Sequence, residues 1–552
     1  MRSSKTCKIK AALSGLSLAD KFFISGLMLL LAVETLYLIY FNFKYSLAAM
    51  DQDAAKLMVH AMEIVKTGHI MIPDWRYMTT HEIDSAMLLA LPIFAVTSDI
   101  GLSFAISNTV YIFVVIALIF TLFNNLRIRF RYAVATCCII LMPYQFGMLE
   151  YLNMMFFRGG QYSIKVLIPL LAITILSFPE KKLSRDITLS AIWLFLVFLC
   201  SFSSGLFPFV TGILPIVGVY VLRFVNDKKD SSVSGFRTLI LSLSVILSMA
   251  GFAIHQIYEI SPSGIDAVVT SSVSFWNRIG INLSYYFSIL NGLPSVDWLY
   301  VNISVPDVNV VSVEGIGYVF RFFLALAVLI IAFRNIIGVF GNKSNNNPAL
   351  SESVVLYMSA IIAGNIIIHL LCSYNTPRYY LIEVIFMLIE AGIFLSSVME
   401  EFKPRIRSFA WICLIISLAV IWYTSKRTVG TNLVLRNYFA SCYDMCDFFL
   451  EQNVDNVIFL DNTPTEEICR VLLPEQKFSN YVSPDKTFIS YDWYKNTGSR
   501  EYYGESSIIV SQYYDDLTPV FGEGVNEKYI YLGSVGSYKM FRSDDFCIPL
   551  ND

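Results

Sequence analysis

Long runs of apolar residues recur along most of the chain, separated by short polar segments. Eleven of these runs approach the roughly 20 residues that an α-helix needs to cross a bilayer. We expect transmembrane helices over 22–42, 100–123, 132–148, 162–178, 187–202, 208–223, 238–258, 315–333, 353–372, 380–399 and 408–424. The first run is long for a cleaved signal peptide, so we interpret it as an anchor. The pattern predicts a polytopic α-helical membrane protein.

The composition agrees with this class. Of the 552 residues, 56% are hydrophobic and 15% are charged, whereas a soluble globular chain has about 45–50% apolar and about 25% charged residues. These values exclude a soluble enzyme and a disordered chain. The net charge of −3 lacks the excess of basic residues that is typical of nucleic-acid-binding proteins, so we expect no nucleic-acid partner.

Lysine and arginine mark one side of the membrane. They crowd the N-terminus and every second loop, as in Arg127, Arg129 and Arg131, and they are sparse in the loops between. By the positive-inside rule the N-terminus is cytoplasmic and the C-terminus lies outside. We find no eukaryotic retention signal and expect a bacterial inner membrane, with membrane lipid as a partner.

The chain divides into a membrane domain, residues 1–425, and a C-terminal domain, residues 426–552. The membrane domain carries long outer loops over 43–99 and 259–314. Beyond residue 424 the apolar density falls. A helix near 438–452, strands at 456–460 and 508–512, and a hairpin from 529–532 and 538–541 predict a small extracytoplasmic α/β domain.

Four cysteines lie in the C-terminal domain: Cys442, Cys446, Cys469 and Cys547. On an oxidising face they form up to two disulfides. Alternatively, Cys442 and Cys446 are small buried residues on one helix face. The sequence leaves both interpretations open. The domain contains no histidine, which argues against a metal site there.

The first outer loop begins with Asp51-Gln52-Asp53. Either aspartate is placed to cap a helix that carries an apolar stripe and ends near Gly68. The stripe consists of Leu57, Met58, Ala61, Met62 and Val65. We expect this amphipathic helix to lie along the membrane surface. A second apolar stretch, 86–96, is short for a span and is also expected at the interface.

The position of Asp51 and Asp53 supports two interpretations. Helix capping is the simpler one. However, both carboxylates follow the first span directly, at the boundary between membrane and water. A partly desolvated carboxylate at this depth is suited to act as a general base.

A first span, a long outer loop that opens with Asp-x-Asp, and an amphipathic helix together resemble the GT-C glycosyltransferases. These polytopic enzymes use sugars linked to polyprenyl phosphate; protein O-mannosyltransferases and the aminoarabinose transferase of lipid A belong to the class. The resemblance covers residues 20–424. It implies that Asp51 or Asp53 binds the acceptor or acts as catalytic base. Some members also hold a divalent cation at this motif, which here would be Mg²⁺ or Mn²⁺ on Asp51 and Asp53.

Several charged residues lie at the outer ends of the spans. Arg158 precedes Gly159-Gly160 and either approaches an anionic ligand or snorkels to lipid headgroups. Glu150 faces the same compartment and is a candidate for substrate binding. Lys165 is expected to snorkel, and His60 and His255 are expected at the interface.

The late outer turn contains Arg378-Tyr379. The resemblance implies that such an arginine holds the donor phosphate, for which its planar fork is suited. Arg321 is a further phosphate candidate, and Tyr379 is a candidate for substrate binding. Trp276, in the second outer loop, either stacks on a sugar or sits at headgroup level.

The resemblance implies an inverting glycosyltransferase. It would move a sugar from a polyprenyl-phosphate donor to a glycan or lipid-linked acceptor, such as O-antigen, on the outer face. A rival interpretation is a transporter or flippase that uses His369, Glu383 and Glu390 as a proton relay. Against it, we see no paired repeats or broken helices. A non-catalytic assembly subunit is a third possibility.

Overall fold

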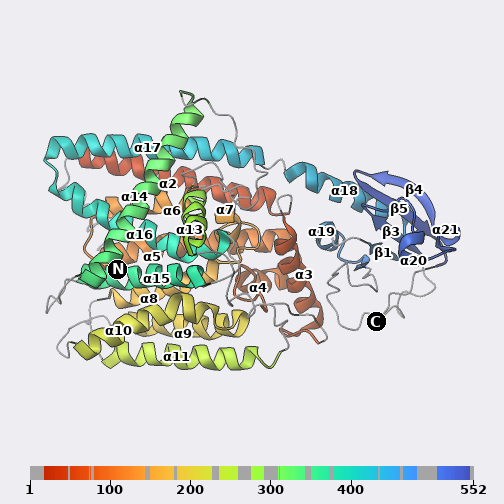
Figure 1. The fold of residues 1–552 in the computed structure, drawn as a ribbon, viewed down its shortest axis with the longest axis horizontal. Helices are drawn as coiled ribbons and strands as arrows, with labels where there is room; N and C mark the ends of the chain where they lie inside the picture. Colours follow the sequence, from red (N-terminus) through yellow and green to blue (C-terminus); the bar gives the residue numbers. More distant parts are fainter. Residues whose placement is uncertain are drawn as a thin grey trace. The chain divides into compact units, whose positions relative to one another are not determined.

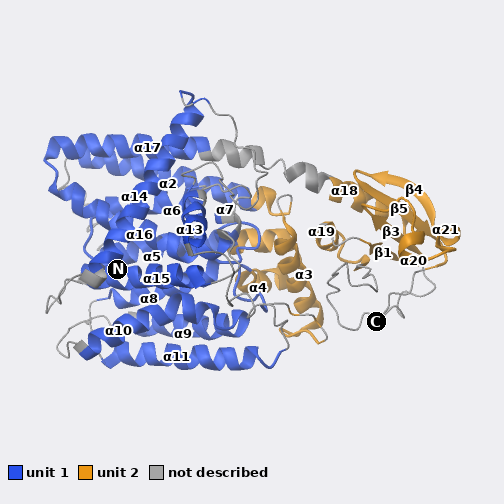
Figure 2. Ribbon diagram, viewed as in Figure 1, with its two compact units in different colours: residues 1–42, 79–86, 108–431 blue, residues 43–78, 87–107, 432–552 orange. Residues whose placement is uncertain are grey.

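The structure is a computed structural model (Figure 1). It describes residues 18–47, 50–73, 75, 77, 80–142, 150–178, 183–226, 235–258, 275–290, 309, 311–341, 350–371, 377–432, 435–460, 464–480 and 506–546. The chain forms two compact units (Figure 2). Unit 1 holds residues 1–42, 79–86 and 108–431, and unit 2 holds residues 43–78, 87–107 and 432–552. Most of the first outer loop therefore shares a unit with the C-terminal domain.

Eight helices in the described part of the chain are long and apolar enough to cross a membrane. They are α2 Leu18–Tyr45, α5 Ile100–Asn125, α9 Leu183–Ser204, α11 Gly235–His255, α14 Val313–Gly341, α15 Leu350–Leu371, α16 Leu381–Glu401 and α17 Pro404–Asn432. Each coincides with a predicted run, although α17 continues beyond residue 424. The protein is an integral membrane protein.

The three other predicted runs are also helical but shorter. They form α6 Phe130–Leu141, α8 Ser163–Leu176, and the π-helix η1 Phe209–Ile213 followed by α10 Leu214–Asn226. Every residue of α8 is buried. A helix that is apolar all round belongs in an interior, so α8 is shielded by protein. The helix expected over 132–148 ends at Leu141, and 143–149 lie outside the described residues.

Helix α16 belongs to the core of unit 1. It packs against α6, α14 and α15, and its first ten residues, 381–390, are all buried. Gly392 faces the side chain of Thr136 on α6 so closely that a Cβ atom would collide with it. This glycine lets the two helices approach each other.

Short helices occupy the predicted outer loops. They are α3 Gln52–Thr67 and α4 Met87–Thr97 in the first loop, α7 Glu150–Met155, α13 Phe275–Ile289 in the second long loop, and the 3₁₀ helix η2 Pro377–Tyr380. In unit 1, α13 packs against α14, α15 and η2, and α7 also packs against η2. These contacts gather the segments around Arg378.

The C-terminal domain is a small α/β domain, as predicted, and its described residues form a five-stranded mixed sheet with helices. Its elements are α18 Leu435–Gln452, β1 Asn456–Phe459, α19 Pro464–Leu472, β2 Lys477–Asn480, β3 Ser507–Ser511, α20 Thr518–Phe521, α21 Val525–Lys528, β4 Ile530–Val535 and β5 Tyr538–Ser543. The strand order is β2-β1-β3-β5-β4. β1 runs parallel to β2 and β3, whereas β5 pairs antiparallel with β3 and β4. Strand β2 and helices α19, α20 and α21 were not predicted from the sequence.

The described cysteines of this domain are buried thiols. Cys442 and Cys446 lie one turn apart on α18, and Cys469 lies on α19, which packs against α18. None of these three forms a disulfide, so the interpretation as small buried residues is confirmed for Cys442 and Cys446. Burial raises the pKa of Cys469 well above that of an ordinary thiol. Cys547 lies outside the described residues.

Candidate active site

Asp51 caps helix α3, as its position predicts. Its Oδ1 atom accepts a hydrogen bond from the backbone N–H of Ala54 at 2.9 Å. Asp53 lies in the first turn. The helix ends at Gly68, which adopts a left-handed conformation (φ 71°) and donates its N–H to the carbonyl of Ile64. Both aspartates are partly exposed at the N-terminal end of the helix.

The apolar stripe of α3 packs against protein. Leu57, Met58 and Ala61 are buried, Met62 is partly exposed and Val65 is exposed. The helix packs against α4 and α19 within unit 2. The expectation that the stripe rests on the membrane surface is therefore wrong, because its buried residues are covered by protein. His60 is also buried and stacks on Trp75.

Arg158 lies inside unit 1, with only 3% of its surface exposed. It has a left-handed backbone (φ 53°), and its carbonyl accepts a hydrogen bond from Asn108 Nδ2 at 2.7 Å. Gly160 follows with φ 49°; a Cβ atom there would lie 2.6 Å from Asn108 Oδ1. The glycine is thus needed for tight packing of the loop. Such burial does not fit snorkelling to headgroups.

Lys165, expected to snorkel, is buried and forms an ion pair. Its Nζ atom lies 3.0 Å from Oδ2 of Asp84. The hydroxyls of Ser203 and Ser204 each donate to this carboxylate at 2.7 Å. Burial opposes ionisation of Asp84, but Lys165 and these hydrogen bonds outweigh it and lower its pKa. Asp84 was not among the predicted site residues, although an acidic residue just before an apolar run is a signal of such a partner.

Two histidines lie beside this ion pair. The Nδ1 atoms of His81 and His255 lie 3.0 and 2.8 Å from the carbonyl oxygen of Phe202, and their rings meet edge to face. Burial, and then the proximity of His255, lowers the pKa of His81 to about 4. His81 is therefore neutral at pH 7. His255 is buried rather than interfacial.

The late outer turn forms η2. Arg378 and Tyr379 are partly exposed there, and the guanidinium of Arg378 lies 5.8 Å from the centre of the Tyr379 ring. Tyr380 is buried, donates its hydroxyl to Asn282 on α13, and stacks on His369. Because α7 begins at Glu150 and packs against η2, the structure brings the Glu150 segment beside the Arg378 segment.

Beneath this turn lies a buried polar cluster. His369 Nε2 lies 2.8 Å from Glu383 Oε1, which also accepts a hydrogen bond from the Tyr286 hydroxyl at 3.3 Å. Glu390 belongs to a separate cluster, where it accepts hydrogen bonds from Ser359 and Asn335. The residues expected to form a relay are thus divided between two clusters with their own partners.

The two remaining candidates differ in exposure. Trp276 lies on α13 and is 77% exposed. The same helix is tied to α15 by Arg278, which donates to the carbonyl of Leu370 at 2.6 Å. Arg321 is buried on α14, with its guanidinium 4.2 Å from the centre of the Tyr318 ring. Trp276 can therefore meet a ligand or a headgroup, whereas Arg321 is enclosed by protein.

Comparison with known proteins identifies the fold. No family model and no curated protein matches the sequence. Among solved structures, ArnT from Cupriavidus metallidurans bound to undecaprenyl phosphate matches with a TM-score of 0.56 and 10% identity, over 94% of this chain and 98% of that chain. Its apo form matches with a TM-score of 0.55 over the same shares. The oligosaccharyltransferase of Archaeoglobus fulgidus has a TM-score of 0.43 and 12% identity, over 93% of this chain and 72% of that chain.

The likeness to ArnT spans nearly the whole of both chains. This chain has the GT-C fold. The fold expected from the first span and the Asp-x-Asp loop is therefore confirmed. The candidate residues belong to both units: Asp51 and Asp53 lie in unit 2, whereas Arg158, Arg321 and Arg378 lie in unit 1.

The described residues do not form a metal site. They contain no group of three His, Cys, Asp or Glu side chains that could hold a metal ion. Asp51 and Asp53 offer two carboxylates, fewer protein donors than such a group needs, although Mg²⁺ usually completes its shell with water and phosphate.

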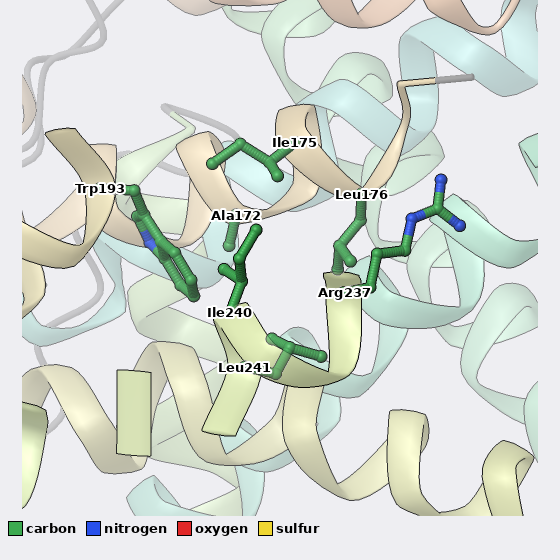
Figure 3. Close-up of a pocket in the computed structure, with 7 residues that line it drawn as sticks. All are labelled: Ala172, Ile175, Leu176, Trp193, Arg237, Ile240 and Leu241. Atoms are coloured by element: carbon green, nitrogen blue, oxygen red, sulfur yellow. The ribbon is translucent and has the colours of Figure 1, made fainter. Parts of the chain in front are cut away.

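A small cavity in unit 1 is not a substrate site. It lies between α8, α9 and α11 and is lined by Ala172, Ile175, Leu176, Trp193, Arg237, Ile240 and Leu241 (Figure 3). Its volume is about 10 Å³, roughly the space of one water molecule. Arg237 donates to the carbonyl of Phe178. A sugar or a lipid headgroup does not fit in this space.

Proposed function

We propose that this GT-C protein transfers a sugar from a polyprenyl-phosphate-linked donor to an acceptor hydroxyl on the outer face of the membrane. The observation that carries the proposal is the fold that this chain shares with ArnT over nearly the full length of both chains. The matching ArnT structure contains bound undecaprenyl phosphate. The first-loop carboxylates and the outer arginines supply the chemistry that such a transfer needs.

Asp51 or Asp53 acts as the general base. The carboxylate takes the proton of the acceptor hydroxyl as its oxygen attacks the anomeric carbon of the sugar. The bond from that carbon to the phosphate oxygen breaks, and its electron pair leaves with the polyprenyl phosphate. One displacement without an enzyme nucleophile inverts the configuration of the sugar.

Arg378 holds the leaving phosphate, whereas the other two candidates, Arg158 and Arg321, are buried in unit 1. Arg378 is our leading candidate because it is partly exposed on η2, beside α7. A guanidinium binds two phosphate oxygens at once and stabilises the negative charge that builds on them. We propose that the sugar or the acceptor is contacted by Tyr379, Trp276 and Glu150.

We propose an envelope glycan such as O-antigen as the acceptor. The positive-inside pattern supports a cytoplasmic N-terminus and a periplasmic C-terminal domain in a bacterial inner membrane. In that orientation the C-terminal domain lies on the side where envelope glycans are modified.

The test is a transfer assay with the full-length protein in proteoliposomes. It uses a panel of polyprenyl-phosphate sugars and lipid-linked glycan acceptors, and it measures the glycan product and the released polyprenyl phosphate. Asp51→Asn and Asp53→Asn are compared with wild type. Because asparagine caps a helix as well as aspartate does, these variants remove the base and keep the cap. Loss of the base is expected to slow transfer about 100-fold or more.

Asp99→Asn is the matched control. Asp99 precedes α5 and accepts a hydrogen bond from the N–H of Leu102 at 2.9 Å, as Asp51 does from Ala54. It is exposed and has no proposed role in transfer. Unchanged transfer in both Asp51→Asn and Asp53→Asn would refute the assignment of the base. A wild-type protein that transfers no sugar from any donor would refute the function.

A further inference from the structure

The C-terminal domain contacts the Asp-x-Asp segment directly. The side chain of Gln52, which stands between the two aspartates, donates a hydrogen bond from Nε2 to Oε1 of Glu467 at 2.9 Å. Glu467 lies in the first turn of α19, and α19 packs along α3 within unit 2 (Figure 2). The contact joins residues 415 positions apart in the sequence.

Glu467 is a fixed acceptor and not a mobile surface group. Only 4% of its surface is exposed. Neighbouring contacts hold α19 to the sheet: the hydroxyls of Thr465 and Tyr538 lie 2.7 Å apart, and Arg470 donates to the carbonyl of Phe478 at 2.8 Å. Arg470 also pairs with Glu466. The position of the Glu467 carboxylate is thus set by the sheet of the C-terminal domain.

Gln52 is the first residue of α3, where the backbone turns into the helix. Asp51 before it accepts the capping hydrogen bond, and Asp53 after it belongs to the first turn. A side chain anchored at Gln52 restricts the backbone on both sides, so it restricts where the two carboxylates can point. The first turn of a helix otherwise frays easily.

We propose that Glu467 is a positioning residue for sugar transfer, which holds Asp51 and Asp53 in place by its hydrogen bond to Gln52. This inference rests on the proposed function. It assigns to the C-terminal domain a part in catalysis: α19 completes the first-loop site, although it supplies no group that touches the reacting atoms.

The experiment uses the full-length protein and four variants. Glu467→Ala removes the acceptor, and Glu467→Gln keeps an oxygen that can accept the same hydrogen bond. Gln52→Ala removes the donor, and the double variant removes both. Glu475→Ala is the control, since Glu475 is an exposed glutamate in the turn after α19. Transfer is measured as kcat and KM, below the temperature at which any variant unfolds.

We expect Glu467→Ala to lower kcat about tenfold with little change in KM for the donor, the size of effect that one lost hydrogen bond produces. The kcat of Glu467→Gln is expected to lie within about threefold of the wild-type value. The double variant is expected to be no slower than either single alanine variant, because both substitutions remove the same contact. A merely structural role would lower the Tm and leave kcat unchanged. Wild-type kcat in folded Glu467→Ala, or fully additive losses in the double variant, would overturn the proposal.

A second measurement separates this inference from the function itself. The coupling between Gln52→Ala and Glu467→Ala in thermal unfolding needs no substrate. If the wild type transfers no sugar while this coupling is clear, the proposed function fails and the link between α3 and α19 stands. If the coupling is absent, the positioning role fails even where the wild type is active.

Discussion

The ammonium group of Lys165 lies 3.0 Å from the carboxylate of Asp84 in the interior of unit 1. The pair connects the segment before α4 to the first turn of α8, and the serine hydroxyls at the end of α9 complete the carboxylate's hydrogen bonds. Two charges that are removed from water depend on each other, because neither has solvent to stabilise it.

Removing one partner of this pair is expected to destabilise the protein. Lys165→Met leaves the Asp84 carboxylate buried without its counter-charge and is expected to cost about 3–5 kcal/mol. Thermal unfolding measures the loss. The control is Lys66→Met, since Lys66 is 73% exposed and pairs with Glu63. That change is expected to cost less than about 1 kcal/mol. Equal losses in the two variants would show that the buried pair has no special role.

A second prediction concerns Arg378. Arg378→Gln keeps hydrogen-bond donors but removes the charge, and it is expected to lower kcat for sugar transfer about 100-fold. Arg378→Lys restores only part of the loss, because a lysine cannot bind two phosphate oxygens in a planar fork. Arg405→Gln is the control, at an exposed position at the start of α17. If Arg378→Gln were no slower than Arg405→Gln, Arg378 would not be the phosphate ligand.

A third prediction tests the contact between α6 and α16. Gly392→Ala places a methyl group against Thr136, whose hydroxyl is held by the carbonyl of Tyr132 at 2.8 Å. We expect a loss of about 1–3 kcal/mol from overpacking. Gly338→Ala on α14 meets no atom within 4 Å, and alanine favours a helix. That variant should be at least as stable as wild type. A stable Gly392→Ala protein would show that the two helices can move apart at little cost.

A fourth prediction concerns pH. Burial, and then the neighbouring Glu466, raises the pKa of Glu467 to about 7 from an ordinary value of 4.5. The folded domain favours the protonated form of Glu467. The contribution of Glu467 to the free energy of unfolding is therefore fully present below about pH 4.5 and is lost as the pH rises through 7. Arg470 and Gln52 also face this carboxylate and temper the effect. Chemical unfolding between pH 5 and 8 measures it.

The comparison for this prediction is Glu467→Gln, which cannot titrate. Its stability should change less with pH than that of wild type over the same range, whereas Glu475→Gln should follow wild type. If wild type and Glu467→Gln have the same pH dependence, Glu467 does not titrate in this range.

Hydropathy predicted the membrane fold because the free energy of moving an apolar helix out of water depends mainly on its own residues. Each of the eleven runs contains a helix within the residues that the structure describes. The cap at Asp51 and the stop at Gly68 were equally predictable, since a cap involves neighbours in sequence. The strands of the C-terminal domain followed from local alternation, although the short β2 did not.

Only the tertiary structure decided which charges are paired and which apolar faces meet protein. Lys165 and Asp84 lie far apart in sequence, so the lysine alone resembled one that reaches for headgroups. The stripe of α3 was evident from the sequence, but its burial by protein was not, because the periodicity of a helix shows that a face is apolar and not what covers it. The sequence by itself determined the helices and the cap and stop of α3. The hydrogen bond between Gln52 and Glu467 and the packing of α7 and α13 against η2 became known only from the tertiary structure. The free energy of such long-range contacts depends on geometry that a local sequence pattern does not specify.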